Sequence, residues 1–342
     1  MRVEIGLDPL QDLFVGEAFA LEPIADFVLE QPGRLDVFDL GFRLGHTSLM
    51  RGLRFEVFSH ARCLPTDSDA EARRVSLRYR GCMPDDPAEL LTEHKDRERA
   101  ESFGTEAERY ERARPSYPSA LVDDLMSDQP RAVLDVGCGT GKAGRLFVER
   151  GCVVTGVEPD PRMADIARTF GIDVDVTTFE DWDDGGRQFD LVTAAQAWHW
   201  VDPTIGPAKA RRVLRGEGRL AIFANHGRHD PEMQRALDAI YARHTDWDSL
   251  AIARGRDDTR RGFIASITAS EGFDKPQFRT YEWDQEYTTE QWIDTLRTHS
   301  NHIALAPEVL DALLTEVAHA IEDRGGVLHS HVVTELITAR AS

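Results

Sequence analysis

Lysine is scarce in this chain of 342 residues. It occurs only four times, and nearly all of the positive charge is arginine dispersed along the sequence. Acidic residues outnumber basic ones and give a formal net charge of -20. Nucleic-acid binding requires clustered Lys and Arg side chains against the phosphates. The composition therefore argues against a nucleic-acid partner.

Cysteine is also rare, and long apolar runs are missing. The four cysteines show no C-x-x-C spacing and no paired histidines, so the sequence predicts neither a zinc site nor a disulfide framework. No apolar run reaches the ~18 residues that span a bilayer. Early acidic residues, such as Glu4 and Asp8, do not fit a signal peptide. We therefore expect a soluble, cytoplasmic protein with reduced thiols and no membrane partner.

The most informative stretch is residues 133–144, which read VLDVGCGTGKAG. A short apolar β run is followed by three glycines at alternate positions, Gly137, Gly139 and Gly141, and then by a helical pattern. Glycine lacks Cβ, so such a turn can adopt positive φ and let a ligand approach the main chain. The helix that follows directs unpaired N–H groups and the positive end of its dipole at the same place. The stretch predicts a site for a nucleotide-like ligand.

Two other loop motifs share parts of this pattern. The phosphate-binding loop of NTPases needs a first glycine where Val136 stands and a Ser or Thr where Ala143 stands, so that interpretation fails twice. A dinucleotide-binding G-x-G-x-x-G can be written so that it ends at Gly144, with Glu158 at a suitable distance to bind a ribose. This second motif makes an NAD(P)-dependent oxidoreductase the alternative function.

The stretch from Asp135 to Gly141 resembles motif I of the class I S-adenosylmethionine (SAM)-dependent methyltransferases, an acidic residue followed by G-x-G-x-G. The resemblance implies SAM as the cofactor, with the glycines under its ribose and methionine and Asp135 near its amino group. It also implies an α/β, doubly wound fold: a seven-stranded, mostly parallel Rossmann-like sheet with helices on both faces and an antiparallel last strand. SAM carries a sulfonium and an ammonium and no phosphate, so a carboxylate suits it and would repel a pyrophosphate.

Two further predicted strands are each followed by acidic or aromatic residues. Glu158 ends a buried strand over residues 152–157 and is placed to accept both ribose hydroxyls, while Asp160 is expected to cap the next helix. Phe179 and Glu180 follow a third strand, where the resemblance implies that main-chain N–H groups contact the adenine. Glu158, Phe179 and Glu180 are therefore predicted to bind the cofactor.

Residues 195–202, AQAWHWVD, place aromatic side chains and a histidine at the carboxyl end of the fourth strand, where open α/β sheets bind ligands. This pattern is similar to the small-molecule, trans-aconitate methyltransferase-like branch of the family. The resemblance implies that Gln196 lies beside the methionine end of the cofactor. His199 is the candidate catalytic residue, which orients or deprotonates a substrate; the alternative is that it caps a turn.

A segment before the glycine-rich stretch, residues 107–118, also resembles that branch, in which it closes over the cofactor. Tyr110 and Tyr117 are candidates to contact SAM or the substrate, or else to pack a helix onto the sheet. Later in the chain, Gly216 and Gly218 follow a helix over residues 207–214 and have the pattern of a C-cap and turn.

The domain organisation has three predicted parts. Residues 1–82 are an extension of unassigned fold, either a small domain or residues upstream of a natural start at Met83. Residues 83–342 are the methyltransferase domain. Within it, residues 227–275 interrupt the alternation of strands and helices and are predicted to supply a substrate lid.

The sequence therefore predicts a SAM-dependent methyltransferase that acts on a small-molecule acceptor by in-line displacement. Such a reaction mainly requires that donor and acceptor are held in near-attack geometry without water. It needs no metal, and it needs a base only when the nucleophile carries a proton. A non-catalytic SAM-binding module is a second alternative, and the acceptor and the oligomeric state stay open.

Overall fold

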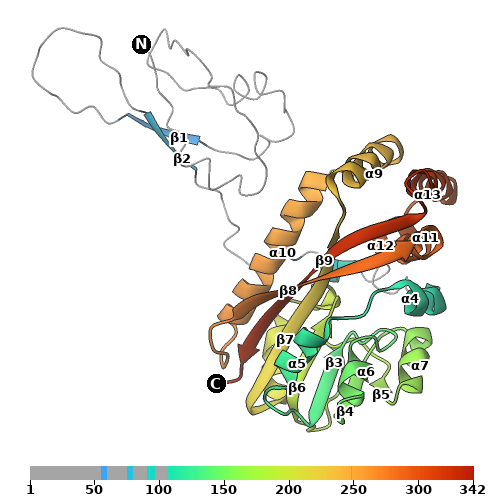
Figure 1. Ribbon diagram of the computed structural model, residues 1–342. Helices are drawn as coiled ribbons and strands as arrows, with labels where there is room; N and C mark the ends of the chain where they lie inside the picture. Colours follow the sequence, from blue (N-terminus) through green and yellow to red (C-terminus); the bar gives the residue numbers. More distant parts are fainter. Residues whose placement is uncertain (1–54, 60–74, 80–90, 92, 97–105, 248) are drawn as a thin grey trace, which may run out of the picture. The chain divides into compact units, whose positions relative to one another are not determined.

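The computed structural model describes residues 55–59, 75–79, 91, 93–96, 106–247 and 249–342 (Figure 1). The chain divides into two units, Met1–Met83 and Pro84–Ser342. In the first unit, β1 (Phe55–Ser59) and β2 (Val75–Tyr79) pair in antiparallel orientation. The rest of the predicted extension, with Met83 itself, lies outside the described residues.

The second unit is built on a seven-stranded sheet with the order β5-β4-β3-β6-β7-β9-β8. Its strands are β3 (Ala132–Val136), β4 (Val153–Val157), β5 (Asp173–Asp175), β6 (Phe189–Ala195), β7 (Leu214–Arg228), β8 (Gln277–Thr288) and β9 (Val327–Arg340). Strand β9 pairs in antiparallel orientation with both of its neighbours, and the other strand pairs are parallel. The predicted fold class, with its antiparallel last strand, is confirmed.

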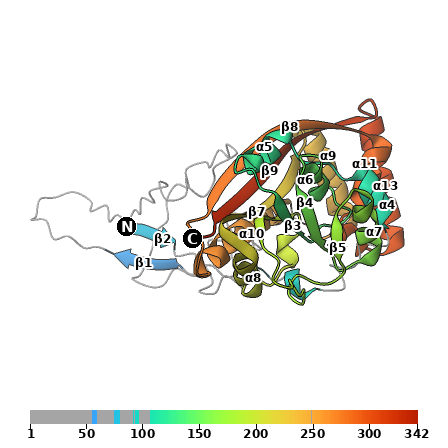
Figure 2. The same ribbon diagram turned by 90° about the horizontal axis from the view of Figure 1, so that it is seen from below.

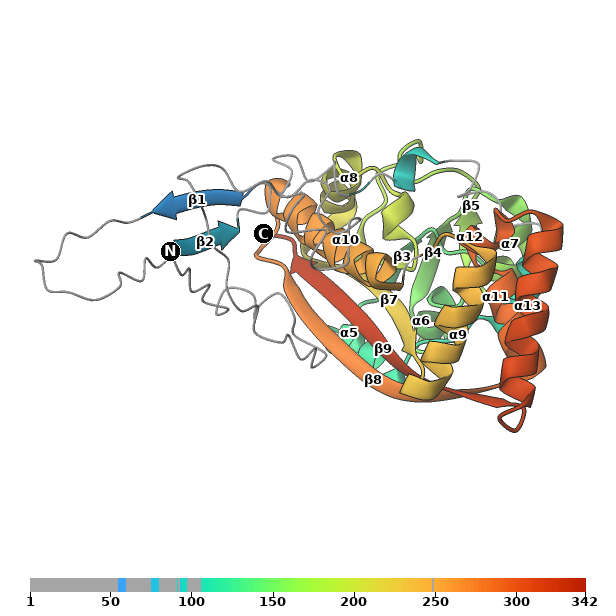
Figure 3. The ribbon, with the colours of Figure 1, turned by 90° about the horizontal axis from the view of Figure 1, so that it is seen from above.

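Helices cover both faces of this sheet (Figures 2 and 3). The helices of the central alternation are α5 (Ser119–Met126), α6 (Gly144–Val148), α7 (Pro161–Thr169), α8 (Ile205–Val213) and α10 (Ser249–Ala269). Alternate residues of β3 face opposite layers: Val133 packs with α5, α6 and α7, whereas Leu134 packs in the cluster that includes α8 and α10. Burial on both faces explains why the strands read as nearly continuous apolar runs. Among the described helices, none has the length and apolarity to cross a membrane.

A separate group of helices gathers at one end of β8 and β9 (Figures 1 and 3). We call this group, which has its own apolar core, the cap: α9 (Pro231–His244), α11 (Thr289–Arg297), α12 (Ser300–Ile303) and α13 (Pro307–Glu322). Helix α11 also contacts α4 (Ala107–Ala113), which precedes the sheet in sequence. The cap therefore lies beside the segment that was predicted to close over the cofactor.

The prediction of a glycine C-cap after α8 is wrong. The helix ends at Val213, and β7 begins at once and contains both Gly216 and Gly218. The pairing of β6 with β7 skips from Leu214 to Arg219, so the intervening residues form a bulge. A Cβ on Gly218 would lie 3.1 Å from the main-chain oxygen of Asp190. Close approach of two backbones explains this glycine, not a helix end.

Candidate active site

The glycine-rich loop follows the carboxyl end of β3. On one side of β3 the sheet continues with β4 and β5, and on the other side with β6 and β7. This is the switch point at which open α/β sheets bind ligands. All three predicted glycines have positive φ, at 62° for Gly137, 55° for Gly139 and 84° for Gly141. Gly137 and Gly139 line the cavities described below. A Cβ on Gly137 would lie only 2.6 Å from the Cβ of Ala197, so the loop accepts no side chain there.

Gly141 has a different role from its two neighbours. A Cβ on it would lie 2.8 Å from Cδ1 of Ile172 and 3.2 Å from Ala167, so it faces the packed layer under α7. It is not among the residues that line either cavity. The structure therefore places Gly141 where it lets the loop pack, and not where it would touch a ligand as predicted.

Two cavities meet at the glycine loop, with empty spaces of about 690 and 840 Å³ when their open mouths are included. Five residues line both cavities and so mark the junction between them: Tyr110, Gly137, Gly139, Ala195 and Gln196. We call them the first and second cavity.

Glu158 lies in the first cavity at the end of β4, as predicted. Its Oε2 accepts a hydrogen bond from the Gly139 N–H at 2.9 Å, and its Oε1 accepts one from the Asp160 N–H at 3.0 Å. Burial nevertheless raises the pKa of Glu158 to about 7, because desolvation outweighs these two bonds. Asp160 caps α7, as predicted, by accepting from the Arg162 N–H at 2.8 Å.

Phe179 and Glu180 take different positions, although they are neighbours in sequence. Phe179 is buried, lines the first cavity and lies 6.2 Å from the ring centres of Trp182 and Trp198. Glu180 is absent from the cavity lining, and its Oε1 accepts instead from the main-chain N–H of Asp202 at 2.7 Å. The predicted pair thus separates into one cavity residue and one residue that holds the neighbouring loop.

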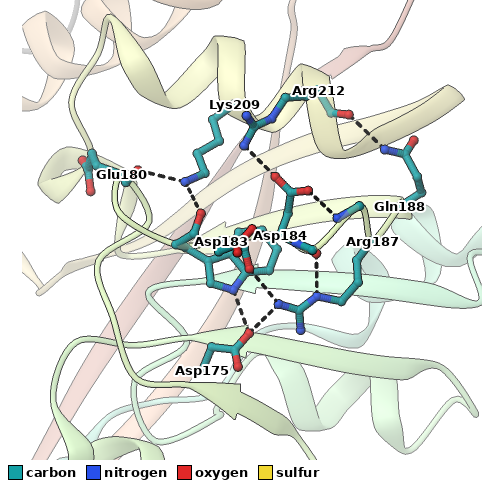
Figure 4. Close-up of polar contacts among 11 residues, drawn as sticks. Asp175, Glu180, Asp183, Asp184, Arg187, Gln188, Lys209 and Arg212 are labelled. Atoms are coloured by element: carbon teal, nitrogen blue, oxygen red, sulfur yellow. Dashed lines mark hydrogen bonds and ion pairs between the residues drawn. The ribbon is translucent and has the colours of Figure 1, made fainter.

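Lys209, which belongs to none of the predicted motifs, holds this loop in place. The Lys209 ammonium donates to the main-chain oxygen of Glu180 at 2.8 Å and to that of Trp182 (Figure 4). Ion pairs of Arg187 with Asp175 at 2.7 Å and of Arg212 with Asp184 at 2.6 Å flank it. The only available signal was a lysine among small residues on an otherwise buried helix face.

Gln196 lies at the junction of the cavities with a φ of 57°, which is unusual for a residue other than glycine. Its N–H donates to the Phe223 carbonyl at 2.9 Å, and its Nε2 donates to the Asn225 carbonyl at 3.0 Å. A left-handed conformation costs of order 1–3 kcal/mol in such a residue and is often found at functional sites. The side chain is therefore held in place beside the glycine loop.

His199 lines neither cavity, and its catalytic role stays a prediction. It lies in the short helix η4 (Trp198–Trp200), with its ring centre 4.7 Å from that of Trp200. Trp200 and Val201 line the first cavity, whereas His199 lines neither. The aromatic residues of this pattern reach the site, but the histidine does not.

Asp135 is fully buried on β3, behind the loop, and lines neither cavity. Its Oδ1 accepts from the Thr193 hydroxyl at 2.9 Å, on the strand with which it is paired. Burial raises the pKa of Asp135 to about 7. The carboxyl group bonds across to β6, and its predicted contact with the amino group of the cofactor stays a prediction.

The second cavity is walled by segments far apart in sequence. The chain around α4 provides Arg114 and Tyr117, and the cap provides Trp292 and His299. Strands β8 and β9 add Tyr287, Ser330 and Val332. Among the described residues of the predicted lid, 227–247 and 249–275, only Gly227 lines either of these two cavities, so the role of this segment as a lid stays a prediction. Tyr110 and Tyr117 both reach cavities, as one of their two predicted roles requires.

Arg114 is a cation without a carboxylate partner among the described residues. Its Nε donates to the Thr298 hydroxyl at 2.8 Å and its Nη2 to the Thr298 carbonyl at 2.9 Å, and its guanidinium lies over the Tyr110 ring. Burial lowers the pKa of Arg114, and no nearby carboxylate offsets the effect. A partly buried cation of this kind favours an anionic ligand group.

Glu111 holds α4 against the glycine loop. It is likewise not one of the predicted site residues. Its carboxylate accepts from the Thr140 hydroxyl at 2.7 Å and from the Arg145 guanidinium at 2.6 Å, with Lys142 3.8 Å away. The partners lie 29 to 34 positions away in sequence, beyond any local pattern. Helix α4 is thus held over the loop at one end and bonded to the cap through Arg114 at the other.

These features fit SAM. The first cavity offers a strand-end carboxylate for ribose hydroxyls, a loop without Cβ atoms and an aromatic wall, while Arg114 offers a cation for a carboxylate. The sheet adds a distinction from nicotinamide enzymes, whose usual strand order is 3-2-1-4-5-6. Here an antiparallel strand is inserted before the edge strand. Fold and site together define a class I methyltransferase.

Comparison with known proteins agrees with this class. A family model for a methyltransferase domain matches residues 110–257. An uncharacterised methyltransferase of Mycobacterium tuberculosis is 33% identical over 235 residues, which cover 67% of this chain and 89% of that protein. The trans-aconitate 2-methyltransferase of Mycolicibacterium gilvum is 32% identical over 133 residues, 37% of this chain and 49% of that protein. A solved structure assigned as a type II methyltransferase from Anaeromyxobacter dehalogenans shares the fold, with a TM-score of 0.51 and 24% identity over 66% of this chain and 97% of that one.

The chain belongs to the class I SAM-dependent methyltransferase family. It is a SAM-dependent methyltransferase, and SAM is its cofactor. The alternative of an NAD(P)-dependent oxidoreductase is therefore dropped, as is that of a non-catalytic module.

Proposed function

We propose that this protein transfers a methyl group from SAM, bound in the first cavity, to a small molecule bound in the second. The observation that carries the proposal is the junction of the two cavities at Gly137, Gly139 and Gln196. Ligands in the two cavities would meet there. The relative named for trans-aconitate methylation acts on a small molecule, which supports an acceptor of this size.

The donor half of the site is assigned to residues of the first cavity and the junction, together with Arg114 of the second cavity. The Glu158 carboxylate accepts the ribose hydroxyls with the lone pairs not used by Gly139 and Asp160. Phe179 packs against the adenine, and Gln196 lies beside the methionine portion. Arg114 pairs with the carboxylate of the methionine portion, which supplies the anion that this cation lacks.

Asp135, Gly141 and Glu180 act indirectly in this proposal. Each lies outside the cavity linings, yet each holds a segment that carries a cavity residue: the loop, its contact with α7, and the chain before Asp202. They are positioning residues. Since a misplacement of about 1 Å can cost 10²-fold in rate, such support belongs to the catalytic design.

When bound, SAM supplies an electrophilic methyl group on a positively charged sulfur. The chain's own contribution is to hold the two ligands in line and to exclude water. Helix α4 serves this purpose, because Tyr110 lines both cavities and Glu111 fastens the helix to the loop.

The test is a calorimetric titration of the purified chain with S-adenosylhomocysteine (SAH). We expect one saturable site, which Gly139→Val abolishes because a β-branched residue resists positive φ. Glu158→Ala should weaken binding by roughly 10- to 100-fold, the cost of hydrogen bonds to a charged group. Glu149→Ala removes an exposed carboxylate outside both cavities and should leave binding unchanged. A folded wild-type chain that does not bind SAH would refute the proposal.

A further inference from the structure

The second cavity contains an imidazole for which no role has yet been assigned. His299 lies at the turn between α11 and α12 and is the N-cap residue of α12. It lines the cavity together with Arg114 and Tyr287. No hydrogen bond joins its ring nitrogens to any described residue, and neither nitrogen is buried without a partner. The imidazole therefore forms part of the cavity wall, and no described residue occupies its ring nitrogens.

The turn that carries His299 is held from both sides. Arg114 donates two hydrogen bonds to Thr298, the preceding residue. The N–H groups of His302 and Ile303 donate to the His299 carbonyl at 3.0 and 2.9 Å. Behind the turn, the Tyr241 hydroxyl and the His302 Nε2 lie 2.8 Å apart in a hydrogen bond. The imidazole therefore sits on a backbone with little freedom.

The groups around His299 favour its neutral form. The charged and titratable side chains near it are Arg114 at the end of α4, Tyr117, Tyr287 on β8 and His302 on α12, and none of them is a carboxylate. Burial lowers the pKa of His299 well below its usual value, and Arg114 and then His302 lower it further. At neutral pH one ring nitrogen therefore offers a lone pair to a proton donor in the cavity.

The cavity walls indicate which acceptor would bring such a donor. Its lining includes four aromatic side chains and two cations, and no carboxylate: Tyr110, Tyr117, Tyr287, Trp292, Arg114 and Lys142. Aromatic walls suit a flat aromatic ligand, and the cavity lining contains no carboxylate that would pair with a cationic amine. An aryl hydroxyl is protonated at pH 7, with a pKa near 10, so it must lose its proton to become a strong nucleophile.

We propose that His299 is the general base that takes the hydroxyl proton of a phenolic acceptor; this rests on the proposed function and names its acceptor class. The acceptor's O–H bond breaks and its proton passes to an imidazole nitrogen. The oxygen's electron pair forms the new bond to the methyl carbon, while the bond from methyl to sulfur breaks and leaves its pair on sulfur. The products are an aryl methyl ether and SAH, and the imidazolium returns the proton to water.

The effect of Arg114 on the pKa of His299 depends on whether SAM occupies the donor half of the site. In the free protein its charge opposes protonation of His299. A carboxylate paired with Arg114 weakens that field, so the pKa of His299 rises toward the range in which a base works best. The imidazole is thereby a stronger base when the cofactor is present.

The test compares two acceptors at about pH 8.5: 4-methylphenol, which is still protonated because its pKa is near 10, and 4-nitrophenol, which is largely ionised. Methyl ether formation is measured by mass spectrometry with SAM as donor. His299→Gln should lower kcat/KM for 4-methylphenol by about 10²–10⁴-fold, the usual contribution of a general base. The loss for 4-nitrophenol should be less than about tenfold, because no proton needs removal. His319→Gln, at an exposed histidine on α13, should change neither.

The other possible results distinguish failure of the role of His299, of the acceptor class and of the proposed function. Equal losses for both phenols, or no loss for either, would overturn the role of His299. Failure of wild-type protein to methylate either phenol, although SAH binds, would overturn the acceptor class and leave the proposed function standing. Absence of SAH binding would overturn both. SAH titration of His299→Gln verifies its fold; if it fails, His299→Asn, verified in the same way, is compared on the same two acceptors.

Discussion

Cofactor affinity should depend on pH through one carboxylate, Glu158. Burial raises its pKa to about 7 in the free protein, whereas ribose hydroxyls donate to its ionised form. Binding therefore requires that the carboxylate lose its proton. With a pKa of about 7, the Kd for SAH should rise about tenfold for each pH unit below 7, or about 1.4 kcal/mol per unit. Above pH 7 the affinity should level off.

The assay is calorimetric titration with SAH between pH 5.5 and 7.5, in two buffers with different ionisation enthalpies. Proton release on binding should make the observed enthalpy depend on the buffer near pH 6. Glu158→Gln should bind more weakly and with little dependence on pH, and Glu149→Gln should follow the wild type. An affinity that stays constant or improves as the pH falls from 7 to 5.5 would refute the reasoning.

The same carboxyl group affects stability with the opposite sign. Because its pKa is higher in the folded than in the unfolded chain, folding favours the protonated form. The contribution of Glu158 to the free energy of unfolding is therefore largest below its ordinary value, 4.5, and is lost as the pH rises toward 7. Asp135, whose pKa is also raised to about 7, acts in the same direction. SAH should restore stability at pH 7 and above.

Two further substitutions test the support of the site. Gly141→Ala should lower the free energy of unfolding by more than about 1 kcal/mol, because the new side chain combines positive φ with a collision against Ile172. The control is Gly151→Ala, which has the same φ of 84° but open space around it, so it measures the backbone strain alone. Equal losses of the two variants in thermal denaturation would contradict the packing role of Gly141. Glu111→Ala should weaken SAH binding by roughly 10- to 100-fold, since each hydrogen bond to a charged group contributes about 1.5–3 kcal/mol and loss of the one from Thr140 loosens α4. An unchanged Kd in calorimetry would contradict the view that α4 covers the cofactor.

Much of the fold was predictable because it is encoded locally. The apolar strands, the glycine loop after β3 and the acid after β4 are patterns of a few adjacent residues, and the sheet order followed from the family that they resemble. Gly137, Gly139, Glu158, Phe179 and Gln196 all line a cavity. Proximity to a strand end was sufficient to find them.

The remaining residues depend on direction and on distant contacts. On a strand, adjacent side chains point to opposite faces, so Asp135 turns toward Thr193, behind the loop. In the short helix η4, Trp200 lines the first cavity and the adjacent His199 does not, and the sequence does not show which of the two neighbours faces the cavity. Arg114 and His299 meet only because α4 and the cap pack together, across 184 sequence positions between Arg114 and Thr298. No local sequence pattern predicts a contact between residues so far apart in the chain.

Strand β9 runs beside β7 over ten residue pairs and beside β8 over twelve. This continuous ladder carries Ser330 and Val332 of the second cavity, with Tyr287 on the partner strand, as an extension of the same sheet that positions the glycine loop. In the proposed arrangement the acceptor wall is thus built on strands, while the donor half lies at the carboxyl ends of β3, β4 and β6 of the same sheet. A change of acceptor preference would then need new side chains at these few positions on β8 and β9, which do not line the first cavity. The fold thereby separates what evolution, or an engineer, can vary from what must stay the same.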